Sequence, residues 1–179
     1  VSEVFDEPGL AAMVLELVDG PDLATAIDGE WEGPWQLPDA WLLMRPVLEA
    51  LSFAHGHGVV HRDLKPENIL LERRDGPWPP VPKVTDFGIA KVVGGDDLQT
   101  RTQARMGTPV YSAPEQMSGG AANVTASADV YSLGMLLWRL LAGRLPVDLD
   151  DEMAVLELRL GRRSPAPLRE VVPDLPAAV

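Results

Sequence analysis

Eight consecutive residues, His61 to Asn68, hold three side chains whose types and spacing suit the transfer of a phosphoryl group. Such a transfer needs a group that accepts a hydroxyl proton, positive charge on the migrating phosphate, and oxygen ligands for Mg²⁺. Asp63 offers the catalytic base, Lys65 the cation and Asn68 a carbonyl oxygen for the metal. Asp86, further along the chain, offers a carboxylate that can bridge metal ions.

These residues belong to three short motifs, which are the string His61 to Asn68, Asp86-Phe87-Gly88 and Ala113-Pro114-Glu115. In order and spacing they resemble the catalytic loop, magnesium motif and activation-segment end of the eukaryotic-type (Hanks-type) serine/threonine protein kinases. The string from Gly107 to Gln116 resembles bacterial members of that family. The resemblance covers essentially the whole chain. It implies an α+β, protein-kinase-like fold, with a mainly helical large lobe and short strands around the catalytic loop.

The resemblance also implies the reactants. ATP would donate the γ-phosphoryl group, with Mg²⁺ (or Mn²⁺ in its place) held by Asn68 and Asp86, and a serine or threonine hydroxyl of a protein would accept it. Lys65 is typical of a serine/threonine kinase rather than a tyrosine kinase. Thr108 resembles the threonine that bonds Asp63 and Lys65 and favours hydroxyl substrates.

The family pattern places the nucleotide against the first third of the chain. Leu15 would close the back of an adenine pocket, and Leu70 would lie under the adenine ring. The carbonyl of Glu16 and the backbone of Val18 would bond the adenine, and Asp22 matches a carboxylate that contacts the ribose.

Other motif residues are expected to build the site without performing chemistry. His61 is interpreted as a packed core histidine rather than a second base, and Phe87 as a neighbour that orients Asp86. Asp129 would anchor the backbone around His61 and Arg62, although a helix N-cap is an equally good interpretation of this residue from sequence alone. Two motif residues, Gly88 and Glu115, complete this structural set.

Arg62 precedes the base, which in the family marks kinases that are activated by phosphorylation of the activation loop. The physical reason is that an unpaired arginine beside the catalytic loop is best neutralised by a phosphate. Thr100 and Thr102 are the candidate acceptors because arginines flank them, but most threonines in such loops are never modified. A homodimer that phosphorylates its own activation loops is the corresponding expected assembly.

Composition narrows the class of partner. The net charge of −12 argues against nucleic acid and is compatible with basic peptide substrates. The chain has no cysteine, which excludes disulfides and thiolate metal sites. The best candidate for a membrane span, Val130 to Gly143, is short and contains Arg139, so a buried helix is the better interpretation. We therefore expect a cytoplasmic protein, or the intracellular part of a membrane-anchored receptor kinase.

Hydrophobic periodicity and breaker residues predict the elements that position these motifs. A helix from Pro38 to about His55 contains Pro46, which predicts a kink or a late start. The other predicted elements are a buried strand Ala12–Leu17, a short helix Leu23–Ile27 capped by Asp22, strands Val59–Val60, Ile69–Glu72 and Lys83–Thr85, and helices Thr125–Leu141 and Glu152–Leu160.

The sequence further predicts a partial kinase domain. Residues 1–20 match the end of the small lobe and the hinge, and residues 21–179 match a large lobe that ends before its last helices. No glycine-rich loop or strand lysine precedes the motifs, so we expect this chain alone to transfer phosphate slowly or not at all. The alternative is a non-catalytic remnant of a kinase lobe that serves as a binding module. The intact set of Asp63, Lys65, Asn68 and Asp86 argues against that alternative.

Overall fold

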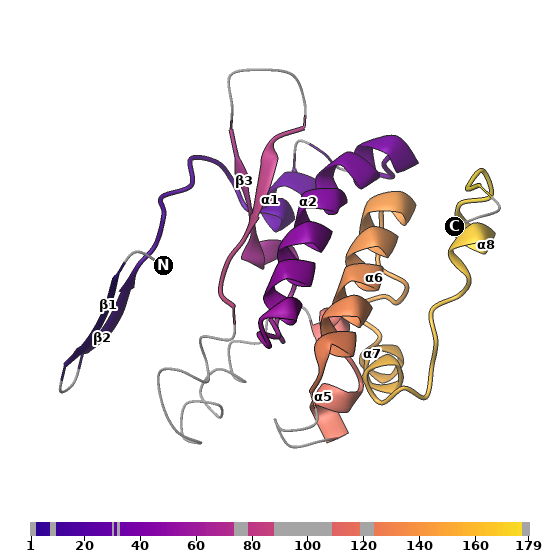
Figure 1. Ribbon diagram of the computed structural model, residues 1–179. Helices are drawn as coiled ribbons and strands as arrows, with labels where there is room; N and C mark the ends of the chain where they lie inside the picture. Colours follow the sequence, from indigo (N-terminus) through magenta and orange to yellow (C-terminus); the bar gives the residue numbers. More distant parts are fainter. Residues whose placement is uncertain are drawn as a thin grey trace.

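The computed structural model describes residues 3–7, 10–29, 31, 33–73, 79–87, 109–118 and 124–176 (Figure 1). Helices dominate these residues. The α-helices are α1 (Leu23–Ile27), α2 (Leu37–Gly56), α5 (Glu115–Ser118), α6 (Ala126–Ala142), α7 (Glu152–Arg159) and α8 (Leu168–Val171). Two short 3₁₀ turns are η1 (Pro66–Asn68) and η2 (Pro109–Tyr111). The strands are β1 (Glu3–Glu7), β2 (Leu10–Val14), β3 (Ile69–Glu72) and β4 (Val81–Val84). These elements form a mainly helical α+β fold with two small antiparallel sheets.

The four strands form two separate antiparallel hairpins. In the first, Glu3 pairs with Val14, and in the second, Ile69 pairs with Val84. Figure 1 shows β1–β2 extending away from the helical body, whereas the β3–β4 hairpin lies against α2. The second hairpin therefore sits where it can position the catalytic loop, since β3 follows η1 directly.

The core lies where α2 and α6 pack side by side (Figure 1). On α2 the residues Leu43, Val47 and Leu51 recur at helical spacing, and each is at most 2 % exposed. Leu136 and Leu140 of α6 meet them and are equally buried. Burial of one such side chain contributes about 1.5–3 kcal/mol, so this seam is the main source of stability near the site. None of the described helices is long and apolar enough to cross a membrane.

Gly143 ends α6 in a left-handed conformation, with φ 67°. A Cβ at this position would lie 2.7 Å from the Pro34 nitrogen, so any larger residue would force the two segments apart. The neighbouring Trp35 N–H donates to the Leu140 carbonyl at 2.8 Å. The loop before α2 thus satisfies an acceptor that the end of α6 leaves without an intrahelical partner.

Several predicted elements are confirmed. Asp22 caps α1, since its Oδ1 accepts the Thr25 N–H at 2.7 Å. The strand Ile69–Glu72 has the predicted bounds and pairs with β4 as expected. A late start for α2 is wrong: the helix begins at Leu37 and continues through Pro46.

Two strand predictions are wrong. The apolar run Ala12–Leu17 is a strand only as far as Val14, and Leu17 is 94 % exposed, because the β1–β2 hairpin has no second layer among the described residues. Val59–Val60 forms no strand. The Val59 N–H instead donates to the Ala54 carbonyl at 2.9 Å, so this backbone continues the C-terminal turn of α2.

Candidate active site

The catalytic loop brings together the three residues that the first motif predicts. Lys65 Nζ lies 2.8 Å from Asp63 Oδ2. The Asn68 side-chain nitrogen donates to the Asp63 carbonyl at 2.7 Å and lies 3.3 Å from its Oδ2. The Asp63 side chain is 59 % exposed, so a hydroxyl group can approach it from solvent. A carboxylate, a cation and an amide therefore share one accessible site.

The oxygens of this site suit Mg²⁺. Because the Asn68 side-chain nitrogen donates to Asp63, its carbonyl oxygen points elsewhere and can act as a ligand. The Thr85 N–H donates to the Asn68 backbone carbonyl at 3.0 Å, which holds the next residue, Asp86, beside the catalytic loop. The Asp86 carboxylate is exposed. Mg²⁺ prefers such oxygens, together with phosphate and water.

His61 is completely buried and uses both ring nitrogens. Its Nε2 donates to the Thr85 carbonyl at 2.8 Å, and its Nδ1 accepts from the Asp63 N–H at 3.3 Å. The Phe87 ring packs against it with the centroids 4.8 Å apart, as the sequence predicts. His61 therefore links the loop that carries Asp63 to the segment that carries Asp86.

Asp129 on α6 holds the start of the catalytic loop. Its side chain is fully buried. Oδ1 accepts the Arg62 N–H at 2.8 Å, and Oδ2 accepts the His61 N–H at 2.9 Å and His55 Nε2 at 2.7 Å. The N-cap of α6 is Thr125, so the N-cap interpretation of Asp129 is wrong and the anchoring interpretation fits the contacts.

Two residues that flank the site have unusual backbone conformations. Arg62 has φ 70° and Asp86 has φ 62°, and within the described ranges no other non-glycine residue has a positive φ. Such a conformation costs about 1–3 kcal/mol and persists only where the surroundings enforce it. Here Asp129 holds the N–H of Arg62, and Thr85 is held by both His61 and Asn68 immediately before Asp86.

Sequence reasoning missed Gln116 on α5. Its side-chain nitrogen donates to the Arg62 carbonyl at 2.5 Å, and its Oε1 accepts the Ala113 N–H at 2.8 Å. One amide thus joins the third motif to the residue before Asp63. Its role could have been suspected from the sequence, because Gln116 directly follows the third motif and an amide side chain can donate and accept hydrogen bonds at once. His55 was also missed, because its contact with Asp129 spans 74 residues.

The predicted nucleotide side is far more open. Leu15 is 44 % exposed among the described residues, and its role at the back of an adenine pocket stays a prediction. The carboxylate of Glu16 pairs with Lys83, which also lies 2.9 Å from Glu72. These bonds to Glu16 and then Glu72 raise the pKa of Lys83.

The structure describes the other residues that are predicted to contact the nucleotide. Val18 and Leu70 are half-buried, and an isolated bridge pairs Leu70 with Asp22. The Asp22 carboxylate already accepts from Thr25 as the cap of α1. Four predicted site residues lie outside the described residues, namely Gly88, Thr100, Thr102 and Thr108.

Comparison with known proteins decides the family. The model of the protein kinase domain matches residues 1–165. The chain belongs to the protein kinase domain family. Glu115, the last residue of the third kinase motif, opens α5.

The chain is similar to several bacterial serine/threonine kinases, and it spans less than a third of the length of each of the two described next. The chain is 40 % identical over 174 residues to serine/threonine-protein kinase PkaA of Streptomyces coelicolor, covering 97 % of this chain and 30 % of the relative. It is 39 % identical over 183 residues to Pkn1 of Myxococcus xanthus, covering 100 % and 25 %. The crystal structure of the Mycobacterium tuberculosis PknI kinase domain matches with TM-score 0.63 and 26 % identity, over 89 % of this chain and 51 % of that one.

Proposed function

We propose that the protein containing this chain is a serine/threonine kinase that transfers the γ-phosphoryl group of ATP to protein hydroxyls with Mg²⁺. The observation that carries the proposal is the cluster of Asp63, Lys65 and Asn68, joined through Thr85 to Asp86. Family membership and the names of the bacterial relatives support the choice of reaction.

Each side chain has a defined task in this proposal. Asp63 accepts the proton of the substrate hydroxyl, and Lys65 places positive charge beside the transferring phosphate. Asn68 and Asp86 hold Mg²⁺, which when bound neutralises charge on the phosphates. Asp129, His61 and Gln116 keep the loop in the conformation that places Asp63.

The chain covers only part of such a kinase. We propose that residues 1–20 are the end of the small lobe with the hinge, where Glu16 and Val18 bond the adenine, and that residues 21–179 are large lobe. The exposure of Leu15 supports this division, because an adenine pocket needs a cover there. Phosphorylation of Thr100 or Thr102 by a second copy, read by Arg62, is the proposed activation step, and Thr108 is the proposed contact to Asp63 and Lys65.

The test is Asp63→Asn in the full-length protein. Loss of the base should lower turnover by about 10²–10⁴-fold, because positioned bases contribute that much. Nucleotide affinity, measured by calorimetry, should stay essentially unchanged. Phosphate transfer is followed with ATP labelled at the γ-position and a serine-containing protein. Equal turnover of the two proteins would refute the role of Asp63.

A second candidate is a non-catalytic binding module. The open hinge side, with Leu15 and Leu17 exposed, favours it for the isolated chain. Transfer by the full-length protein that disappears in Asp63→Asn would exclude this candidate. Nucleotide binding without any transfer by either protein would support it.

A further inference from the structure

Ser164 is the only serine, threonine or tyrosine between Leu133 and Val179. It lies in the segment of residues 160–167 that joins α7 to α8. Figure 1 shows this segment as a stretched-out connection on the side of α6 away from α2. Ser164 is exposed. An enzyme that modifies hydroxyl groups could therefore reach it without opening the fold.

The backbone at Ser164 belongs to no helix or strand. The N–H groups of Arg162 and Arg163 bond the Glu157 carbonyl at 2.9 and 3.2 Å, in the turn that closes α7. Pro165 then contributes no N–H group, and the residue before a proline avoids the helical region. The Ser164 hydroxyl thus lies on an extended segment that can enter the active site of another protein as it stands.

The other exposed hydroxyl groups of the described residues are less available. Thr25, Ser52 and Ser127 lie within helices, and Thr125 is the N-cap of α6 and bonds Ser127. A helical residue can enter an active site only after the helix has opened locally, which costs free energy. Ser164 needs no such opening.

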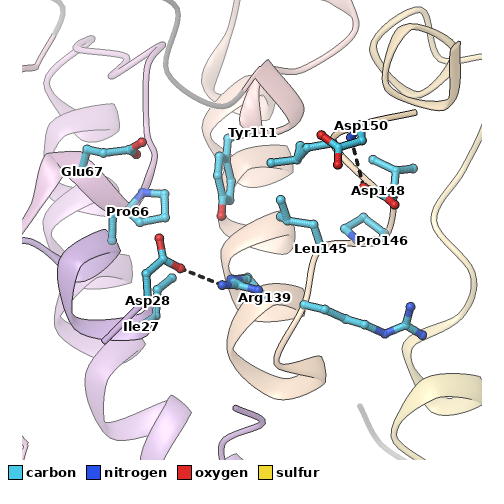
Figure 2. A pocket seen from close by; sticks show the side chains of 14 residues that line it. Ile27, Asp28, Pro66, Glu67, Tyr111, Arg139, Leu145, Pro146, Asp148 and Asp150 are labelled. Carbon is cyan, nitrogen blue, oxygen red and sulfur yellow. Dashed lines mark hydrogen bonds and ion pairs between the residues drawn. The ribbon is translucent and has the colours of Figure 1, made fainter. Parts of the chain in front are cut away.

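Local charge also distinguishes Ser164. The protein has a net charge of −12, and the surface beside the catalytic loop is acidic. Figure 2 shows this in a pocket of about 520 Å³, where Arg139 already pairs with Asp28 at 2.7 Å. The other carboxylates that line the pocket are Glu67, Asp148 and Asp150. Such surroundings would repel a phosphate.

Arg162 and Arg163 provide the opposite surroundings for Ser164. Both are exposed, and neither has an ion-pair partner among the described residues. A phosphate on Ser164 would lie beside two guanidinium groups that can form charge-assisted hydrogen bonds with it. Ser52 lacks this advantage, because Glu49 precedes it by one turn of α2.

Ser164 cannot reach Asp63 of its own chain. Its segment is held at both ends, because a Cβ at Gly161 would lie only 3.5 Å from Pro114 Cβ and Leu168 packs against the core. Figure 1 places the segment beyond α6, whereas β3, which follows the catalytic loop, lies at the opposite side of the helical body. A phosphate on Ser164 must therefore come from another molecule.

We infer that Ser164 is a phosphorylation site that a second copy of this kinase modifies. The inference rests on the proposed function, which it deepens by naming a substrate. In the transfer, Ser164 Oγ forms a bond to the γ-phosphorus of ATP, the bond from that phosphorus to the β–γ bridging oxygen breaks, and ADP leaves. The hydroxyl proton passes to Asp63 of the second copy.

The experiment separates the enzyme from the acceptor. Full-length wild-type protein acts as the kinase on full-length Asp63→Asn, with ATP and Mg²⁺. Cleavage after glutamate releases residues 158–170, in which Ser164 is the only hydroxyl-bearing residue, and residues 50–67, in which Ser52 is the only one. Mass spectrometry follows the addition of one phosphate to each peptide over time. Ser52 is the matched internal control, because it is an exposed serine on a helix.

Ser164 should be phosphorylated at least about tenfold faster than Ser52, because α2 must open before Ser52 can be modified. The Asp63→Asn protein incubated without the wild type should gain no phosphate at Ser164. Equal rates at the two serines would mean that only unfolded protein is modified, and this would overturn the inference. Phosphate at Ser164 in the Asp63→Asn protein alone would assign the modification to a different enzyme and overturn it as well.

The two proposals fail in different ways. Transfer to an unrelated serine-containing protein without phosphate at Ser164 would refute the inference and leave the kinase assignment intact. Absence of transfer to either protein would refute the proposed function, and the inference with it.

Discussion

The two ends of the candidate site differ sharply in how they are held. At the catalytic loop, the backbone is held by Asp129 of α6 and Gln116 of α5, and the buried His61 within the loop bonds the Thr85 carbonyl. At the predicted hinge, Leu15 and Leu17 are 44 % and 94 % exposed, and the Glu16 carboxylate that pairs with Lys83 is also exposed. The groups that would handle the phosphate are thus organised within this chain, whereas those that would hold the adenine lack a cover among the described residues.

The two regions also differ in how much their contacts contribute to the free energy of unfolding. Buried hydrogen bonds to a carboxylate are costly to break, because they leave donors without partners in a low-dielectric interior. Exposed ion pairs and apolar side chains contribute little to stability. Substitutions on the two sides should therefore have effects of very different size.

The largest effect is expected for Asp129→Ala. The change leaves the N–H groups of His61 and Arg62 without their acceptor, so the free energy of unfolding should fall by about 3–5 kcal/mol. Chemical denaturation of the full-length protein measures it. Asp129→Asn keeps one acceptor oxygen and should lose less. A loss under about 1 kcal/mol for the alanine variant would show that the catalytic loop is held by other contacts.

Gln116→Ala should have the next largest effect. It removes one bond to Arg62 and one to Ala113, for an expected loss of about 1–2 kcal/mol and a lower kcat with little change in KM for ATP. Gln116→Glu is the informative partner, because it keeps the acceptor for Ala113 but turns an oxygen toward the Arg62 carbonyl. If the glutamate variant matched the wild type in kcat, the bond to Arg62 would be irrelevant to catalysis.

Alkaline pH should lower the free energy of unfolding through ionisation of Tyr111. Burial raises the pKa of its hydroxyl in the folded protein, whereas an unfolded tyrosine has a pKa near 10. The contribution of this pKa difference to the free energy of unfolding is therefore fully present below about pH 10. It is lost as the pH rises, by about 2 kcal/mol at pH 12. Tyr111→Phe should show a shallower decline in the free energy of unfolding over the same range. Parallel declines would mean that Tyr111 ionises freely in the folded state.

The smallest effect is expected on the hinge side. Leu17→Ser should change the free energy of unfolding of this chain by no more than about 0.5 kcal/mol, since the side chain is almost fully exposed. Thermal denaturation of the 179-residue chain measures it. In the full-length protein the same variant is a sensitive probe, because a larger loss there would reveal contacts that cover Leu17.

The sequence predicted the catalytic cluster well because local spacing determines it. Asp63, Lys65 and Asn68 lie within six residues, so one loop suffices to bring them together. The cap at Asp22 and the strand Ile69–Glu72 are local in the same sense. Nucleotide, metal and regulatory roles stay predictions.

The features that could not be predicted from the sequence depend on which surfaces pack against each other in the fold. An apolar run such as Ala12–Leu17 has the same pattern whether or not another layer covers it, so its exposure was not predictable. The side-chain partners of Asp129, and the Arg62 carbonyl that Gln116 bonds, lie 54 to 74 residues away, and no periodicity encodes such pairs. Asp129 could be interpreted as a cap or an anchor until α6 was seen beside the loop.

The left-handed backbone at Arg62 and Asp86 has a consequence for protein engineering. Glycine adopts such φ values without steric cost, so a substitution to glycine at either position should relieve strain of about 1 kcal/mol or more. A library selected only for yield or thermal tolerance would then enrich glycine at both positions. It would discard the guanidinium proposed to read phosphorylation and the carboxylate proposed to bind metal, so screens on this scaffold need an activity readout from the first round.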